Sequence, residues 1–341
     1  MTTRDPSSLG QRRARVLKAI IDEYVCSGAP VGSATVLGRS GLDVSSATVR
    51  NDMAALEADG YIFQPHTSAG RVPSQSGYRW YVDNWASAER LPSSDKDEIG
   101  DFFAGVDAGI ERLLAGTSRL LTSLTSLAAV VLAPHWQDAA LASVHLTMLD
   151  PRRLLVVLVT RSARVLKVTV ETDTDVAGDR LAIADEVLKR HLVGSSQWSL
   201  HRAATEHPDP DVAFVLGSVC DALDRAERTD SEVYSGGIAN LAAVLDPSDD
   251  LTEVLELLDE HQRMAALLQQ LVERDGLGVV VGIGTEVPSL HGMSVVAAPY
   301  KAGDATGALG LLGPLRMDYT HAMSAVHAVT DHLESTLQHC D

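Results

Sequence analysis

The most constraining feature of the sequence is a run of three short amphipathic segments near its beginning, separated by helix-breaking residues. From Arg12 to Ser27, apolar side chains recur at the i, i+3, i+4, i+7 and i+8 positions of one helical face. Gly28-Ala29-Pro30 ends this segment, and Ser33 is a suitable N-cap for a second helix that reaches about Ser40. Gly41-Leu42-Asp43 then interrupts the chain. The pattern predicts three short helices with a tight turn between the second and the third.

The third helix is predicted to expose a small, polar face. It begins after a cap at Ser45 or Ser46 and runs to about Asp59, just before Gly60. Its buried face is predicted to consist of Val49, Met53 and Leu56. A turn of about 100° per residue then places the remaining residues outward. These are Ala47, Asn51, Ala54 and Ala58, flanked by Thr48 and Arg50.

A short hairpin is predicted directly after the third helix. Tyr61-Ile62-Phe63 is typical of a strand, a turn-rich stretch follows, and the chain returns at Val72-Pro73. A helix-turn-helix followed by a hairpin is the order of elements in winged helix-turn-helix DNA-binding domains. Small alanines allow a helix to enter the major groove, where Asn51 can pair with adenine and Arg50 can reach guanine or a phosphate.

Eleven residues are therefore predicted to contact DNA. Those at the third helix are Ser45, Ser46, Ala47, Thr48, Arg50 and Asn51, and those in the hairpin are His66, Thr67, Ser68, Gly70 and Arg71. Simpler interpretations stay open at this point. The helix face could be merely solvated, the two serines could serve only as caps, and the hairpin could be only an exposed turn.

The charge distribution agrees with a DNA partner at one end of the chain. The net charge is -18, but residues 1–90 hold 10 Lys and Arg against 9 Asp and Glu, and the remaining residues hold 18 against 37. An acidic bulk repels DNA except at a neutral or basic face, and so orients the protein on the duplex.

Three cysteines without paired spacing predict neither a disulfide framework nor a cysteine zinc site. The apolar run 124–134 is too short to cross a bilayer and no signal peptide opens the chain, which favours a soluble cytoplasmic protein.

The rest of the chain is predicted to be an α+β domain with an inserted module. A linker is expected at residues 90–95. Helices are expected at 97–131 (with a possible interruption near Gly116), 179–192, 211–228, 251–274 and 319–339. Strands are expected at 141–149, 153–160 and 164–172 as a meander, and at 277–283, 293–298 and 308–312. The predicted aromatic helix from Ser74 to Trp85 would supply packing at a core or a domain junction. The predicted domains are 1–90, then 91–194 together with 276–341, with 195–275 inserted.

No pattern in the sequence indicates enzymatic chemistry. Gly282-Ile283-Gly284 lacks the third glycine of a dinucleotide-binding loop, and no nucleophile elbow or Ser-His-Asp arrangement is present. His321, His327 and His332 are not spaced to share one helical face as metal ligands. The prediction is a protein that is not an enzyme and needs no cofactor or metal.

Several motifs resemble those of the HrcA family of heat-inducible transcription repressors. The most specific are the run 45–53, Gln64 to Pro73, and Gly77 to Asp83, with further matches at 234–241, 283–286 and 313–319. The resemblance covers essentially the whole chain. It implies a homodimer with a winged-helix domain, a GAF-like domain and an inserted, mainly helical dimerisation domain. It also implies binding to double-stranded DNA at an inverted repeat called CIRCE, and activity modulated by the chaperonin GroEL.

Two questions remain open from the sequence. A GAF-like domain often binds small molecules, so a metabolite-responsive winged-helix regulator is the alternative function; a cavity lined by convergent polar groups in that domain would favour it. The apolar stripe around residues 255–271 could contact a second subunit, although burial within its own chain is the more frequent fate of such a stripe.

Overall fold

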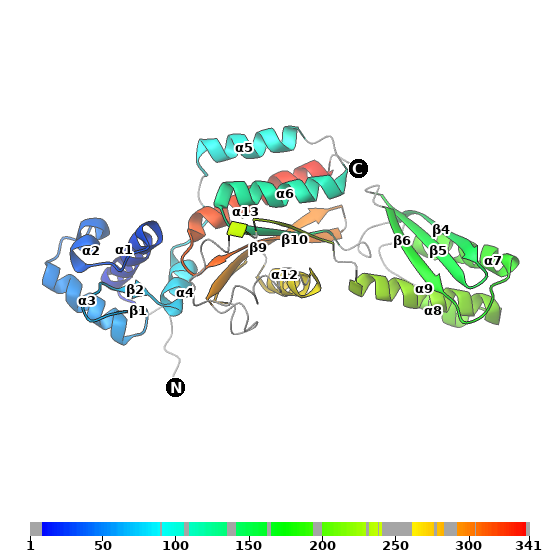
Figure 1. Cartoon of the computed structure of the whole chain (residues 1–341), viewed down its shortest axis with the longest axis horizontal. Coiled ribbons are helices and arrows are strands. Elements are labelled where there is room, and N and C mark those ends of the chain that lie inside the picture. Colours follow the sequence, from blue (N-terminus) through cyan, green and yellow to red (C-terminus); the bar gives the residue numbers. More distant parts are fainter. Residues whose placement is uncertain are drawn as a thin grey trace.

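The computed structural model describes residues 9–88, 91–105, 109–134, 141–161, 165–193, 200–229, 232–237, 239–240, 261–275, 278–282, 292–303 and 305–338. These residues form a mixed α+β protein, as predicted, in three units along an elongated molecule (Figure 1). We call them the N-terminal unit (residues 9–88), the central unit around a five-stranded sheet, and the inserted unit (residues 141–229), which lies at the end opposite to the N-terminal unit.

The N-terminal unit contains the predicted helices and hairpin. Its elements are α1 (Gln11–Ser27), α2 (Ser33–Ser40), α3 (Ser46–Ala58), β1 (Ile62–Phe63), β2 (Val72–Pro73) and α4 (Gln75–Asn84). Gly28 and Gly41 end the first two helices in the left-handed conformation, with φ of 67° and 61°. Ser33 is the first residue of α2 and Gly32 occupies the cap, so the predicted cap at Ser33 was wrong by one residue. The strands pair antiparallel, with Ile62 opposite Pro73.

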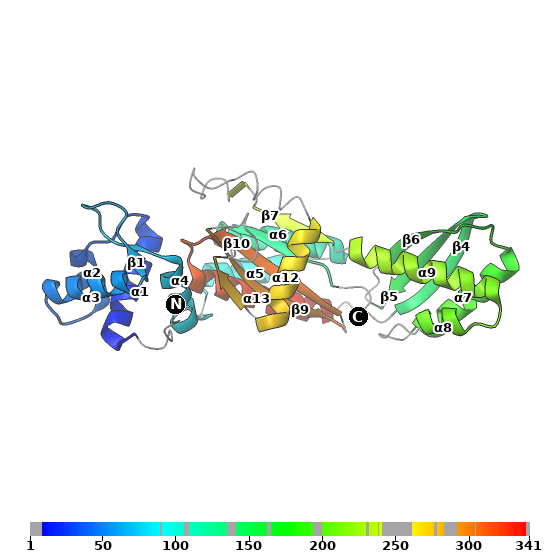
Figure 2. The same cartoon turned by 90° about the horizontal axis from the view of Figure 1, so that it is seen from below.

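The central unit is an antiparallel sheet with helices on both faces. Its strand order is β7-β3-β10-β9-β8, formed by β7 (Val233–Gly236), β3 (Ala128–Leu132), β10 (Ala305–Pro314), β9 (Met293–Ala302) and β8 (Gly278–Val281). One face is covered by α6 (Ile110–Thr125) and α13 (Tyr319–Gln338), and α5 (Ser93–Ala104) packs on the outside of these two helices. The other face is covered by α12 (His261–Asp275), which crosses β9 and β10 in Figure 2.

The prediction of a single long helix at 97–131 was wrong. The chain leaves α5 at Ala104, starts α6 at Ile110 and enters β3 at Ala128. All five residues of β3 are buried, with Val131 facing the α6 side and Val130 facing α12. A strand buried on both faces has a continuous apolar sequence without alternation, so its period does not distinguish it from a buried helix. Gly116 does not interrupt α6; it allows the ring of Phe102 to pack closely against that helix.

The inserted unit has its own sheet and its own core. The predicted meander is present as β4 (Leu141–Asp150), β5 (Arg153–Thr160) and β6 (Val165–Glu171), in the order β4-β5-β6. One face of this sheet packs against α7 (Gly178–Leu192), α8 (Leu200–Glu206) and α9 (Pro210–Thr229). Alternate residues of β6 are buried and exposed, which is the pattern of a sheet covered on one side.

The predicted boundaries of the insert, 195–275, are therefore corrected. The strands at 141–171 share a hydrophobic core with α7, α8 and α9, whereas α12 packs on the central sheet through Leu267, Leu268 and Leu271. The inserted unit is α+β rather than mainly helical. The motif near Tyr234 belongs to β7 of the central sheet. Residues 255 and 258 of the apolar stripe lie outside the described residues, and its described leucines are buried within the chain. Sequence order alone does not reveal to which of two sheets a strand belongs.

The aromatic residues of α4 join the N-terminal unit to the central unit, as predicted. Tyr78 is buried, and its ring centroid lies 5.9 Å from that of Tyr319 at the start of α13. Burial raises the pKa of the Tyr78 hydroxyl, so the group stays protonated. Beside it, the Arg79 guanidinium donates to the Val281 carbonyl oxygen at 2.9 Å. One continuous hydrophobic core runs from α1 through α4 to α13. The linker predicted at 90–95 was wrong for residues 93–95, because α5 begins at Ser93.

Candidate nucleic-acid interface

The exposed face of α3 is the one predicted from the sequence. Val49, Met53 and Leu56 are buried against α1 and α2, and Asp52 is buried beside them. The residues exposed on the other side are Ala47, Arg50, Asn51, Ala54 and Ala58, with Ser46 and Thr48 half-buried. The Asn51 side chain makes no hydrogen bond to any residue that the structure describes. Its amide is therefore available to an external partner.

A buried carboxylate fixes α3 on α1. Asp52 accepts two hydrogen bonds from the Arg12 guanidinium, at 2.7 Å to one oxygen and 2.9 Å to the other. Arg13 adds a more distant ion pair at 3.8 Å. The hydrogen bond to Asp52 and the charge of Asp52 raise the pKa of the Arg12 guanidinium, so Arg12 stays charged. Because Asp52 neighbours Asn51 in the helix, this pair also fixes the direction of the exposed face.

The beginning of α3 lies close to the beginning of α2. The Ser45 hydroxyl accepts from the Thr48 amide at 3.2 Å and lies 2.9 Å from the Thr48 hydroxyl, so Ser45 is the cap of α3. The Arg50 guanidinium donates to the Ser33 hydroxyl at 3.3 Å. Among the described residues, no carboxylate lies within ion-pairing distance of Arg50. Arg50 is thus a positive charge held at the junction of the two helices.

The hairpin carries its predicted residues on an exposed turn that is fixed by a glutamine. His66, Thr67 and Ser68 are exposed. The Gln64 amide donates to the carbonyl oxygens of Thr67 at 3.0 Å and of Ala69 at 2.9 Å. The turn is therefore closed from within and keeps its shape without a ligand.

Gly70 and Arg71 dock the base of the hairpin onto the helices. The Arg71 amide donates to the Val31 carbonyl at 2.9 Å, and the Val31 amide donates back to the Arg71 carbonyl at 2.9 Å. A Cβ at Gly70 would lie 2.5 Å from the Val31 carbonyl atoms, so only glycine allows this approach. The Arg71 guanidinium binds the Glu57 carboxylate of α3 at 2.7 Å and is mostly covered. Arg71 thus has a charged partner within the protein, whereas the partner of Arg50 among the described residues is the neutral Ser33 hydroxyl.

Three functional candidates were missed by the sequence analysis. Glu57 and Gln64 hold the hairpin, and Ser33 holds Arg50. The resemblance motif included Gln64, but only the contacts reveal that its side chain turns back into the loop. Pairing of Val31 with Arg71 had no signal in the sequence, because one residue between a proline and a glycine is too short to read as a strand.

The part of the chain that the structure describes contains neither a candidate metal-binding cluster nor a candidate membrane-spanning helix. No group of three His, Cys, Asp or Glu side chains within those ranges is placed to bind a metal ion. No helix there is long and apolar enough to span a bilayer. His321 is paired with Asp95 at 2.9 Å, at the start of α13 and away from the α3 surface.

Comparison with known proteins decides the family. The family model described as the HrcA protein C-terminal domain matches residues 111–323. The chain belongs to the HrcA family. Relatives named heat-inducible transcription repressor HrcA are found in Kineococcus radiotolerans (39% identical), Nocardioides sp. (38%) and Parafrankia sp. (36%). Each alignment covers 96% of this chain and 98 to 99% of the relative.

The HrcA family consists of transcription repressors and not of enzymes, in agreement with the motifs absent from the sequence. A solved structure supports the fold: the crystal structure of a hypothetical protein superimposes with a TM-score of 0.65 at 24% identity, covering 98% of this chain and 100% of the other. The family model begins at residue 111, whereas the alignments with the named relatives also extend over the N-terminal unit.

Proposed function

We propose that this HrcA-family chain represses heat-shock operons as a dimer that binds double-stranded DNA through its N-terminal unit. The observation that carries the proposal is the α3 surface, where Asn51 and Arg50 are exposed next to a pre-shaped hairpin. In this reading the N-terminal unit is a winged helix-turn-helix domain, with β1 and β2 as its wing, and the central unit is a GAF-like domain.

The exposed face of α3 is suited to the major groove. Ala47, Ala54 and Ala58 are small, which lets the helix backbone approach the bases. Asn51 can form two hydrogen bonds with an adenine edge, and Arg50 can exchange its Ser33 contact for guanine or a phosphate. Ser45, Ser46 and Thr48 at the start of α3 would contact a phosphate.

The wing contributes contacts that depend less on sequence. His66, Thr67 and Ser68 would contact the sugar-phosphate backbone or the minor groove beside the half-site read by α3. Gly70 and Arg71 fix the position of the turn by their contacts with Val31 and Glu57. Arg71 would add electrostatic attraction to phosphate only by competing with Glu57 for its guanidinium.

Dimerisation, the operator and the chaperonin come from the family resemblance. A two-fold dimer matches an inverted repeat such as CIRCE, with two recognition helices entering major grooves a whole number of helical turns apart. GroEL would keep the repressor active, and unfolded protein that occupies the chaperonin would leave the repressor inactive. The acidic central and inserted units would be turned away from the duplex.

A metabolite-responsive regulator receives no support from the pocket at the edge of the central unit. This pocket, about 390 Å³, lies between α1, α4 and the start of α13. Its polar groups already bind one another: Lys18 contacts Asp22 at 2.6 Å, and the Tyr81 hydroxyl donates to Asp22 at 3.1 Å. A small-molecule site would instead present unsatisfied groups to its ligand.

Titration of the purified chain against a CIRCE duplex and a scrambled duplex of equal length tests the proposal. At fixed salt we expect selective binding of the CIRCE duplex, and stronger binding when GroEL is added. Selectivity without a GroEL effect would contradict the chaperonin part alone. Equal binding of both duplexes by the folded dimer would contradict the assignment of the N-terminal unit.

A further inference from the structure

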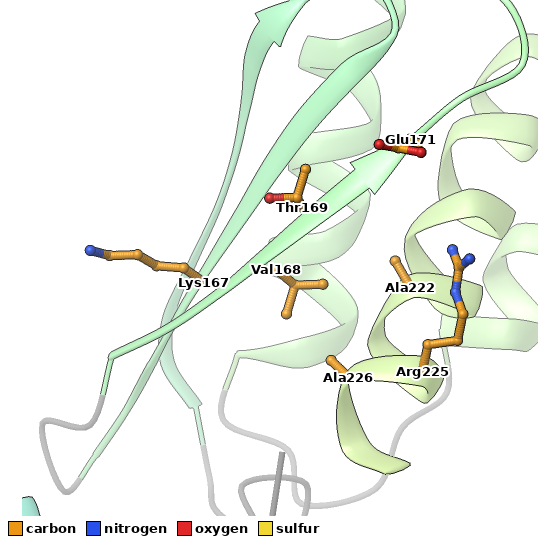
Figure 3. A pocket seen from close by; sticks show the side chains of 7 residues that line it. All are labelled: Lys167, Val168, Thr169, Glu171, Ala222, Arg225 and Ala226. Atoms are coloured by element: carbon orange, nitrogen blue, oxygen red, sulfur yellow. The ribbon is translucent and has the colours of Figure 1, made fainter. Parts of the chain in front are cut away.

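The junction between the N-terminal and central units leaves room for movement. A pocket of about 390 Å³ lies between α1, α4 and the start of α13, and Tyr319, which packs against Tyr78, forms part of its wall. The groove of about 440 Å³ in the inserted unit differs, because its lining residues come only from β6 and α9 of that unit (Figure 3). Of these two cavities, only the first lies between elements of different units, and it gives α4 space to tilt against α13.

The apolar contact at this junction does not by itself fix the angle of α4. The buried Tyr78 ring is inclined by 47° to the ring of Tyr319, but the Tyr78 hydroxyl has no hydrogen-bond partner among the residues that the structure describes. Burial of apolar surface is non-directional, whereas a hydrogen bond weakens when its donor turns away from the acceptor. Polar side chains around Tyr78 are therefore needed to fix the orientation of the N-terminal unit.

Two side chains of α4 bind the end of β8. Gln75 and Arg79 are four positions apart, so both lie on one face of the helix. The Arg79 guanidinium donates to the Val281 carbonyl oxygen at 2.9 Å. The Gln75 amide donates to the same oxygen at 3.3 Å and to the Gly282 carbonyl oxygen at 3.2 Å. Gly282 has a φ of 73°, and its missing Cβ leaves the space that the Gln75 side chain fills. The end of β8 is thus shaped to receive α4.

A third polar contact joins the central unit to α1. The Arg316 guanidinium, in the segment before α13, lies 6.0 Å from the centre of the Tyr24 ring and occupies the space that a Cβ of Gly28 would fill. Gly28 caps the C-terminal end of α1, where the helix dipole favours a cation. Because the central unit holds both α1 and α4, rotation of the N-terminal unit about either helix is opposed.

We propose that Gln75, Arg79 and Arg316 are positioning residues for operator binding, which set the angle of the N-terminal unit and thereby the half-site spacing that the dimer accepts. The inference rests on the proposed function, and it names the residues that determine one part of its specificity. One extra base pair moves a half-site by about 3.4 Å and turns it by about 35°. A dimer with fixed recognition helices rejects such an operator, whereas a dimer whose N-terminal units can tilt accommodates it.

Operators of different spacing test the proposal. The double variant Gln75→Ala/Arg79→Ala removes all three hydrogen bonds to the end of β8. Fluorescence anisotropy compares its affinity for the CIRCE duplex with that for a duplex lengthened by one base pair between the half-sites. We expect the ratio of these affinities to fall at least about fivefold from the wild-type ratio. Arg316→Ala should also lower the ratio, and Arg112→Ala, at an exposed position of α6, is the control that should leave it unchanged.

A duplex with one half-site separates positioning from base recognition. Only one N-terminal unit binds such a duplex, so the affinity for it should be the same in wild type and in the double variant. A variant that had lost its fold would bind this duplex more weakly. An unchanged spacing ratio in the double variant, together with wild-type affinity for the single half-site, would refute the proposal.

A distance measurement tests the same residues without DNA. Spin labels are attached at Ala54→Cys on α3 and Arg119→Cys on α6, in a chain with Cys26→Ser and Cys340→Ser that is diluted with unlabelled chain. We expect a narrow distribution of distances in this background and a broad one when the double variant is added to it. An equally narrow distribution would overturn the role of Gln75 and Arg79. A wild type without preference for CIRCE over a scrambled duplex would contradict the proposed function, and the label distances would still decide whether these residues position the N-terminal unit.

Discussion

Replacement of Asn51 by alanine separates operator recognition from folding. The side chain is exposed, and none of the described residues accepts or donates a hydrogen bond to it. Alanine also favours the helical conformation more than asparagine does. We therefore expect Asn51→Ala to change the free energy of unfolding by no more than about 0.5 kcal/mol, as for other surface substitutions.

The expected loss lies in discrimination between DNA sequences. A bidentate amide-adenine contact discriminates against a wrong base by about 1 to 3 kcal/mol. Two half-sites in one operator double this to about 2 to 6 kcal/mol for the dimer, which corresponds to at least about a thirtyfold loss of operator affinity. Affinity for a scrambled duplex should stay the same, because phosphate contacts do not involve the Asn51 amide.

Fluorescence anisotropy with labelled operator and scrambled duplexes at one salt concentration measures both affinities. The matched control is Gln11→Ala, which removes an exposed amide at the start of α1. We expect the control to bind both duplexes as wild type does. If Asn51→Ala kept the wild-type ratio of operator to scrambled affinity while remaining folded, the assignment of the α3 face would be refuted.

Three further predictions follow from single contacts. Arg71→Ala should weaken binding to all duplexes and flatten its salt dependence, whereas Arg119→Ala should not; a loss at one base position only would make Arg71 a base reader. Leu56→Ala should lower the free energy of unfolding by about 2 to 5 kcal/mol in urea titrations, since the side chain is fully buried; a smaller loss would contradict this packing. The hydrogen bond from His321 lowers the pKa of Asp95, so the pair's contribution to stability is present above the ordinary Asp pKa and is lost as pH falls through the lowered one. Asp95→Asn should therefore reduce stability at neutral pH and flatten its acid dependence; identical pH profiles would exclude this linkage.

The N-terminal unit was predictable because local rules determine it. Glycines in the left-handed conformation end α1 and α2, a serine caps α3, and the apolar spacing specifies the buried faces. Each of these signals lies within a few residues of the element it controls. The exposure of Arg50 and Asn51 follows directly from the helical period.

The boundary between the central and inserted units was not predictable, because it depends on pairings between distant residues. β3 pairs with β10, which lies about 180 residues later in the chain. The residues of the two strands do not indicate that these strands pair with each other. The same limit applies to the candidate site. Arg71 and Glu57 are 14 positions apart, and Arg71 and Val31, which join the hairpin to the helices, are 40 positions apart. The sequence shows the charge or apolar character of each residue, but it does not show that these residues are in contact.

The continuous core between the N-terminal and central units has a consequence for how heat could relieve repression. An inverted repeat requires two recognition helices at a fixed separation. In this chain the position of α3 is fixed through α4, whose Tyr78 is buried against Tyr319 of α13. If the two subunits join at the inserted unit, at the far end of the molecule, the separation of the two α3 helices depends on every packed layer between them. Under the proposed function, loosening of the central core by heat would then abolish cooperative binding of both half-sites, even though each N-terminal unit still carried all the residues proposed to contact DNA.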